Sequence, residues 1–431
     1  MDLYLKIGSL LYFFYHLLYY KRIRTINQKP TENKLCFERS IFHYMITIEK
    51  TFDGKPFQYK PYTAEEIFFF DIETTGFVAD KSFLYLIGCC YYRDATWRLI
   101  QWFAESPMEE KELLSSFITF ASDFKVCMHY NGTTFDLPYI TRKCITNQLD
   151  FSFQNLASVD LYKTAVSLKA LLHLEHCTQK AMEKVLNIPR EDTFSGGDLI
   201  QVYANYVGLA RLEKLQKGRL RLIEEPLKPT APKETESSKD LLHLLLLHNE
   251  EDVIGLSLLT SLLHYQRLFE GCYQVINLSL GEDNCICFTI QPELAIPVSF
   301  STVQNGIRLT VSENSCLLRI PLLEGTLKYF IPDYKDYYYL PYEDTVVHKS
   351  IAGAMDKRYR TKATKDNCYL KKTALFLPQF EPLYSPVFQL ERTDSTLYFE
   401  CLDEQLQDET FLQTYTKHIL QSLVYKKKRK A

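Results

Sequence analysis

From residue 45 onward the chain is a succession of short apolar runs separated by polar turns. Ile67–Phe70 is entirely apolar, as expected for a buried strand. Two more runs, Phe83–Tyr92 and Thr96–Phe103, follow it, and a strand is also predicted to open at Met45. Runs of this length, bounded by turn residues, predict consecutive strands of one sheet.

Helical segments follow these strands. A helix is predicted to begin near Met108, because three glutamates stand in its first turns, where the helix dipole favours acids. Lys125–Tyr130 predicts another strand, and Phe135–Lys143 predicts a second helix. Strands followed by helix, strand and helix predict an α/β fold with a mixed sheet flanked by helices.

The second half of the chain changes character twice. Residues 214–239 are charged and contain three prolines, so a surface loop is predicted there. Leu241–Leu263 is strongly apolar and predicts a helix or a helix pair. Beyond residue 270 short strand-like runs return, and we expect three parts: an N-terminal extension at 1–44, an α/β domain at 45–270 and a smaller C-terminal α+β domain at 275–431.

Composition excludes several classes of protein. Hydrophobic residues make up 46% of the 431 residues and charged residues 24%, which excludes a disordered chain and a polytopic membrane protein. The net charge of −3 indicates no partner by itself. The 12 cysteines form no CxxC pair, so they predict buried thiols in a reducing compartment, and we expect a cytoplasmic protein with no obligate protein partner.

Residues 7–20 form an apolar run that is followed by basic residues. The run is shorter than the roughly 20 residues that span a bilayer. A signal peptide is disfavoured because the positive charges follow the run instead of preceding it. We favour a packing helix or a misassigned start upstream of Met45, and membrane contact through residues 7–20 is the less favoured interpretation.

Carboxylates stand at three places in the predicted α/β domain. Asp71 and Glu73 are two residues apart on a strand and therefore share a face. Asp136 follows the strand at 125–130, and Asp252 interrupts the apolar helix, with His248 one turn before it on the same face. Oxygen ligands of this kind suit Mg²⁺ or Mn²⁺. Taken singly, a solvated acid pair or a helix-capping acid explains the first two places as well.

The three motifs DIETTG, NGTTFD and HNEED occur in this order. Together they resemble the DEDD superfamily of 3′–5′ exonucleases, which have a ribonuclease H-like fold. The resemblance is strongest to the YprB-like branch, which is related to the proofreading domains of polymerases, and it covers roughly residues 65–267.

The resemblance implies roles for the acidic positions. Asp71, Glu73, Asp136 and Asp252 match the carboxylates that bind two Mg²⁺ or Mn²⁺ ions, and His248 matches the residue near the general base. One feature departs from the pattern. Related proteins carry Tyr four residues before the last acid, or His five residues before it, whereas this chain has His at the Tyr spacing. The implied activity is hydrolysis of phosphodiester bonds in DNA or RNA, at single-stranded or 3′ ends.

Further residues are candidates for substrate binding. In the α/β domain they surround the acids or carry a positive charge: Thr74, Thr75, Gly76, Asn131, Phe135 and Lys180. In the C-terminal domain, residues 349–372 carry eight basic residues against two acids, with tyrosines nearby. Positive charge beside aromatic rings suits single-stranded nucleic acid, and the candidates there are Lys357, Arg358 and Arg360.

Two alternatives remain open at this point. The chain could be a non-catalytic module that keeps the fold and only binds nucleic acid. It could also be an endonuclease or resolvase, which cuts internally instead of from an end.

Overall fold

The computed structural model describes residues 45–220, 237–281 and 283–424. Its described residues divide into two compact units, the first formed by 45–166, 175–220 and 237–262, and the second by the rest. The domain limits expected from the sequence remain a prediction. The apolar run at 7–20 lies outside the described residues, and no helix in the described part has both the length and the apolar character needed to cross a bilayer.

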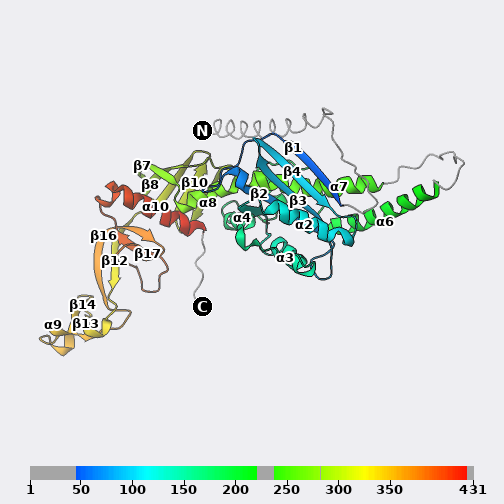
Figure 1. Ribbon diagram of the computed structural model, residues 1–431. Coiled ribbons are helices and arrows are strands. Elements are labelled where there is room, and N and C mark those ends of the chain that lie inside the picture. Colours follow the sequence, from blue (N-terminus) through cyan, green and yellow to red (C-terminus); the bar gives the residue numbers. More distant parts are fainter. Residues whose placement is uncertain (1–44, 221–236, 282, 425–431) are drawn as a thin grey trace. The chain divides into compact units, whose positions relative to one another are not determined.

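The first unit is built on a six-stranded mixed sheet with the strand order β1-β4-β3-β2-β5-β6 (Figure 1). The first four strands in this order pair antiparallel, whereas β5 and β6 join the sheet in parallel. The mixed sheet predicted from the sequence is therefore confirmed. The strands are β1 (Ile46–Phe52), β2 (Ile67–Thr74), β3 (Leu84–Arg93), β4 (Thr96–Phe103), β5 (Val126–His129) and β6 (Ala157–Asp160).

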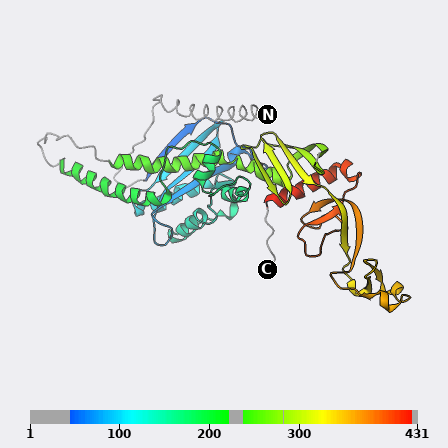
Figure 2. The same ribbon diagram turned by 180° about the vertical axis from the view of Figure 1, so that it is seen from behind.

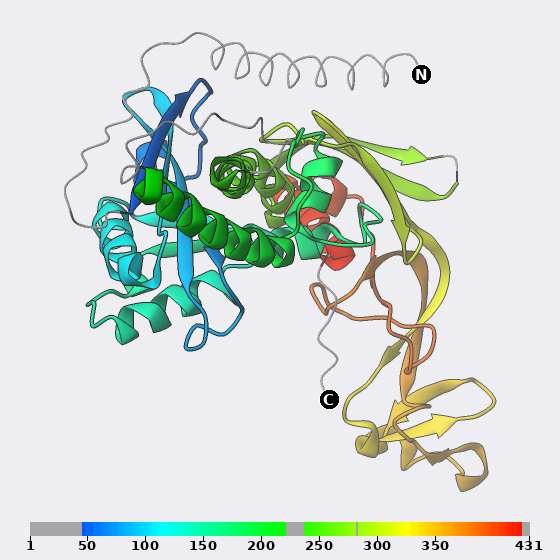
Figure 3. The same cartoon turned by 90° about the vertical axis from the view of Figure 1, so that its right-hand side faces the viewer.

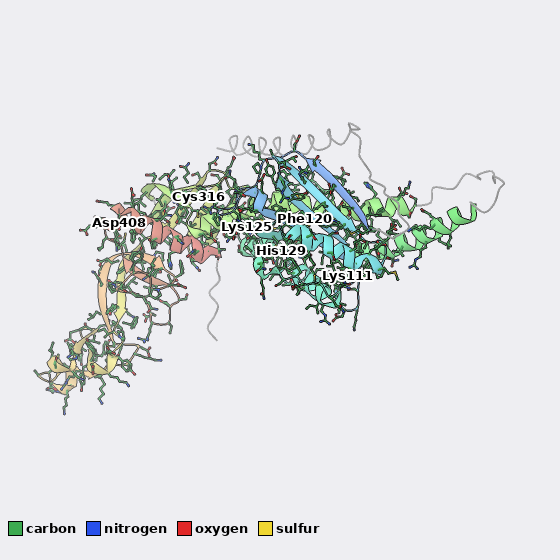
Figure 4. All side chains as sticks on the ribbon, viewed as in Figure 1. Lys111, Phe120, Lys125, His129, Cys316 and Asp408 are labelled. Carbon is green, nitrogen blue, oxygen red and sulfur yellow. The ribbon has the colours of Figure 1, made fainter. Side chains whose placement is uncertain are left out.

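The central strand β2 is buried along both faces, and its alternating side chains have different partners. Phe68 and Phe70 point toward α2 (Glu110–Ala121), where they contact the rings of Phe120 and Phe117. The intervening positions face the opposite side of the sheet. Lys125 and His129, labelled in Figure 4, mark the two ends of the neighbouring segment that contains β5. Asp71 and Glu73 lie within β2, three residues and one residue before its end.

Five more helices complete the first unit or border it: α3 (Asp136–Thr146), α4 (Leu161–Leu168), α5 (Gln179–Val185), α6 (Gly196–Leu220) and α7 (Ser238–Leu259). Helices α6 and α7 pack side by side, as Figures 1 and 2 show. The prediction that a loop begins at residue 214 is wrong, because α6 continues to Leu220. Residues 221–236 of that loop lie outside the described residues.

Helix α7 lies close to the sheet at Gly88 of β3, the residue that pairs with Asp71. A Cβ atom at position 88 would lie 1.9 Å from the side-chain oxygen of Asn249 on α7, so any larger residue would force that side chain to move. The polar segment at 248–252 does not break α7, which is one continuous helix. Its polar side chains are therefore carried against the sheet at the level of Asp71.

The second unit contains α8 (Leu262–Glu270), α10 (Glu409–Val424) and a five-stranded antiparallel sheet of order β7-β8-β11-β10-β9. Strands β12 (Leu323–Phe330) and β16 (Tyr369–Gln379) form a long ribbon, visible in Figure 3, with β17 (Leu397–Glu400) beside it. Residues 331–368, here called the tip segment, are inserted at the end of this ribbon. The remaining strands are β7 (Tyr273–Gly281), β8 (Cys285–Pro292), β9 (Phe300–Gln304), β10 (Ile307–Ser312), β11 (Ser315–Pro321), β13 (Tyr337–Leu340), β14 (Thr345–His348) and β15 (Thr361–Lys362).

Candidate metal centre and its surroundings

Two of the predicted acids come from β2 and point toward α7. The Asn249 side-chain amide donates to the carboxylate of Asp71 over 3.2 Å and to its backbone carbonyl over 3.3 Å. The other end of that amide is fixed, because Asn249 Oδ1 accepts a hydrogen bond of 2.9 Å from the buried Gln101. Asn249 therefore holds Asp71 in one orientation. Glu73, which is 6% exposed, faces the same helix one position further along the strand face.

Asp136 reaches the same place from the first residue of α3. The loop before it is fixed by Asp160, whose carboxylate accepts the backbone amides of Asn131 at 2.8 Å and Thr133 at 3.4 Å. Asn131 has a φ of 62°, so this loop makes a tight left-handed step after β5. Asp136 is buried, and the backbone at Asp136 and Ile72 acts to lower its pKa against the larger effect of burial.

His248 and Asp252 on α7 complete the cluster. The imidazole Nε2 lies 3.1 Å from Asp252 Oδ2 and 3.5 Å from Glu73 Oε1. Glu73, His248 and Asp252 each offer one ligand atom, and these atoms lie within 4.8 Å of one another. The structure thus brings one strand acid and two residues on one face of α7 together, and their role as metal ligands remains a prediction.

The carboxylates on the sheet side of the cluster repel one another. Burial raises the pKa of Asp71 well above its ordinary value, and the charges of Asp252, Glu73 and Asp136 raise it further. Burial also raises the pKa of Glu73 to about 8, although the nearby His248 works in the other direction. The pKa of Asp136 rises to about 7, again chiefly through burial. Of these three acids, Glu73 has the imidazole of His248 beside it, but its pKa is raised all the same.

The opposite side of the cluster is compensated by Arg190, in the segment between α5 and α6. Its guanidinium lies 2.6 Å from Asp252 Oδ1, 3.1 Å from Asp192 Oδ2 and 3.2 Å from Glu183 Oε2. Burial opposes the charged form of Asp252, but hydrogen bonds from His248 and Arg190 outweigh it and lower the pKa. In Asp192, burial is likewise outweighed, chiefly by Lys180 and His248, and the pKa falls to about 2.

The donor set suits a hard divalent cation. It consists of one carboxylate oxygen each from Glu73 on β2 and Asp252 on α7 with one imidazole nitrogen of His248, and the charges of Asp71 and Asp136 act on the same group. Mg²⁺ and Mn²⁺ bind such oxygen ligands. A cation placed among these acids would favour their ionised forms, which burial alone disfavours.

The predicted substrate residues near the acids take part in the loops that surround the cluster. Thr74 Oγ1 donates to the Gly76 carbonyl over 2.9 Å, and Thr75 Oγ1 accepts the amide of Phe83 over 2.8 Å. The side chain of Asn131 is bonded to Thr134 within its own loop. The ring of Phe135 lies 6.1 Å from that of Phe77, which is 78% exposed.

The predicted basic residues have acidic or aromatic partners. Lys180 is bonded to Asp192 over 2.9 Å, and its ammonium also contacts the Phe194 carbonyl. In the tip segment, Arg358 is paired with Asp356 over 2.8 Å and Arg360 lies 4.6 Å from the ring centre of Tyr338. Half of the eight basic residues at 349–372 are in ion pairs, namely Lys349, Arg358, Lys371 and Lys372.

Sequence reasoning missed the residues that hold the cluster in place: Asn249, Asp160, Arg190, Asp192, Glu183 and Glu251. Asn249 stands beside His248 in the polar segment 248–252 of α7. This neighbourhood was the only feature of the sequence that could have indicated its role. From the sequence alone, Glu251 is predicted to lie on the exposed face of the helix. In the structure its carboxylate accepts the backbone amides of Glu191 at 2.8 Å and Asp192 at 2.9 Å. It thereby anchors the segment that carries Arg190.

Residues 68–217 match the RNase_H_2 family model of the RNase_H superfamily. The fold of the first unit is ribonuclease H-like. This finding confirms the fold class that the motifs implied. The ribonuclease H-like fold is a nuclease-type fold. The assignment to the YprB-like branch remains a prediction. No curated protein matches the chain.

Among solved structures, the chain resembles the family B DNA polymerase from the hyperthermophilic archaeon Pyrobaculum calidifontis at 11% identity, with a TM-score of 0.34. The match covers 68% of this chain and 41% of the polymerase, so this chain spans less than half of the polymerase's length. A likeness of this strength says nothing about activity.

Proposed function

We propose that the protein is a divalent-metal-dependent nuclease that acts as a 3′–5′ exonuclease on nucleic acid. The observation that carries this proposal is the convergence of buried acids from β2, α3 and α7 around His248. Keeping several acids together at the core of a fold is costly unless a cation compensates them. The match of residues 68–217 to the RNase_H superfamily supports the same conclusion.

Asp71, Glu73, Asp136 and Asp252 would hold two Mg²⁺ or Mn²⁺ ions. When bound, the ions would neutralise the charge of the scissile phosphate and assist both the attacking and the leaving oxygen. The protein's own contribution is orientation. Asn249 fixes Asp71, and Asp160 fixes the loop that leads to Asp136. His248 is held beside Glu73 and Asp252, where it can accept a proton from the attacking water.

The rim of the cluster supplies candidates for contact with the terminal nucleotide. The Thr74–Gly76 turn and Asn131 border the acids, and Phe135 presents a ring beside the exposed ring of Phe77. Aromatic rings stack on unpaired bases with little preference for sequence. A single-stranded 3′ end is therefore the substrate that these side chains suit best.

The tip segment is the second proposed contact with nucleic acid. Lys357 is exposed, Arg360 lies against Tyr338, and the exposed rings of Tyr342 and Tyr359 are 6.0 Å apart. Because about half of the surrounding basic residues are already in ion pairs, the expected contribution is moderate. Replacing Lys357 and Arg360 by alanine should weaken binding and reduce its salt dependence by roughly one to two phosphate contacts.

The decisive experiment is degradation of 5′-labelled single-stranded DNA, double-stranded DNA and RNA, with and without Mn²⁺. We expect stepwise shortening that needs the metal and is abolished in Asp71→Asn and Asp252→Asn. Asp123→Asn, an exposed aspartate that pairs with Arg93, serves as the matched control.

The products also distinguish the alternatives. Internal cuts would indicate an endonuclease or resolvase. Binding without any hydrolysis in Mn²⁺ would indicate a non-catalytic binding module, and equal cleavage by Asp71→Asn would refute the assignment of the acids.

A further inference from the structure

His248 is held at both ring nitrogens. Its Nε2 faces Glu73 and Asp252, as described above, while its Nδ1 lies 2.7 Å from Asp192 Oδ2. Asp192 is 8% exposed and His248 is 3% exposed, so water does not compete for this contact. Asp192 lies in an irregular segment 56 residues before His248.

The position of Asp192 is itself fixed by several contacts. Its Oδ1 accepts the backbone amide of Phe194 at 3.0 Å, and its Oδ2 accepts hydrogen bonds from Lys180 at 2.9 Å and from Arg190. Arg190 also binds Asp252, the acid on the far side of the imidazole. The four side chains Arg190, Asp192, His248 and Asp252 therefore form a closed ring of hydrogen bonds.

This ring determines how the imidazole is oriented. An ionised carboxylate only accepts hydrogen bonds, so Nδ1 must be the donor to Asp192. On the other edge of the ring, Nε2 lies 3.1 Å from Asp252 Oδ2 and faces Glu73. The contact at Nδ1 therefore fixes the direction in which Nε2 faces the group formed with Glu73 and Asp252.

We propose that Asp192 is a positioning residue, which acts through His248 by fixing the orientation of its ring at Nδ1, with Arg190 tying Asp192 to Asp252. The inference rests on the proposed nuclease function, because it assigns a partner to the histidine of that site. Removal of a carboxylate that holds a metal-binding histidine in this way typically lowers metal affinity or activity about 10- to 100-fold.

The first test is a double-mutant cycle. Asp192→Asn should lower kcat about 10- to 100-fold while the KM for nucleic acid changes little. In a His248→Ala background the same substitution should have no further effect, because its route of action is already lost. Asp198→Asn, in the same segment and bonded only to Ser195 in the described structure, is the matched control and should retain the wild-type kcat.

Losses that multiply in the double mutant would overturn the proposal, since they would mean that Asp192 acts independently of His248. An Asp192→Asn enzyme with wild-type kcat would overturn it as well. The two outcomes differ from failure of the proposed function, in which the wild-type protein itself hydrolyses nothing.

A second test needs no variant and no metal. Nitrogen-15 NMR of the wild-type imidazole should show a proton on Nδ1 of His248, held in the hydrogen bond to Asp192. An Nδ1 that carries no proton would overturn the proposal, even if Asp192→Asn failed to fold or the protein proved inactive.

Discussion

The two sides of the carboxylate cluster differ in how their charge is compensated. On the sheet side, Asp71, Glu73 and Asp136 have raised pKa values. Asp71 is held there by the neutral amide of Asn249. On the other side, Asp192 and Asp252 have lowered pKa values and are bonded to cations of the protein itself. Both sides are similarly buried, so burial does not explain the difference.

The difference indicates which acids need an external cation. A buried acid that is paired within the protein is already stabilised, whereas acids that only repel one another remain protonated or bind a metal. We therefore assign Arg190 and Asp192 to the permanent framework of the site. In the proposed function, Asp71, Glu73 and Asp136 form the side that would bind cations, and Asp252 with His248 joins the two sides.

The largest effect is expected from removing the compensation. Arg190→Met would leave Glu183, Asp192 and Asp252 without their shared cation. Breaking a buried ion pair by removal of one partner costs about 3–5 kcal/mol, so thermal unfolding should show a Tm lower by roughly 10 °C. Burial lowers the pKa of Arg190, but its acidic partners outweigh this effect and raise the pKa above its ordinary value.

Arg142→Met is the matched control for this prediction. Arg142 is bonded to Asp80 over 2.6 Å, but both side chains are about half exposed. Its replacement should hardly change the Tm, because exposed pairs contribute little. Equal losses of stability in the two variants would contradict the division of the cluster into two sides.

The orientation of several side chains in the cluster follows from local periods in the sequence. Asp71 and Glu73 are two residues apart on an apolar strand, and the period of a strand places them on one face. His248 and Asp252 are likewise related by the period of a helix. Local periodicity was thus enough to orient four of the five central side chains, and the motif resemblance linked them.

The compensated side could not be predicted in the same way. Arg190 and Asp192 stand in a segment without regular structure, so no period indicates where they point. Their partners are about 60 residues away in the chain, and the contact depends on how Glu251 anchors the segment. The sequence alone also overestimated the unpaired positive charge of residues 349–372. Lys349 and Lys371 pair with Asp336 and Asp344, which lie outside this range.

A second prediction concerns the affinity for Mn²⁺. Metal ligands must lose their protons, and the pKa values of Glu73 and Asp136 are about 8 and about 7. The affinity should therefore rise with pH, by up to about tenfold per pH unit for each proton released between roughly pH 6 and 8. Calorimetry in two buffers of different ionisation enthalpy would measure the protons released. Binding that releases no proton in this range would contradict the uncompensated character of the sheet side.

The smallest effect is expected for the stability of the metal-free protein. The pKa of Glu73 is raised from 4.5 to about 8 in the folded state, so its contribution to stability is present at low pH and is lost as the pH rises toward 8. Glu73→Gln keeps the shape of the side chain but cannot ionise. Its Tm should match that of the wild type near pH 4 and exceed it by a few degrees near pH 8. Glu112→Gln, at an exposed position of α2, should show no such divergence. A Glu73→Gln protein that is less stable than the wild type near pH 8 would mean that Glu73 is compensated by His248 alone, and the two sides of the cluster would then differ less than their partners suggest.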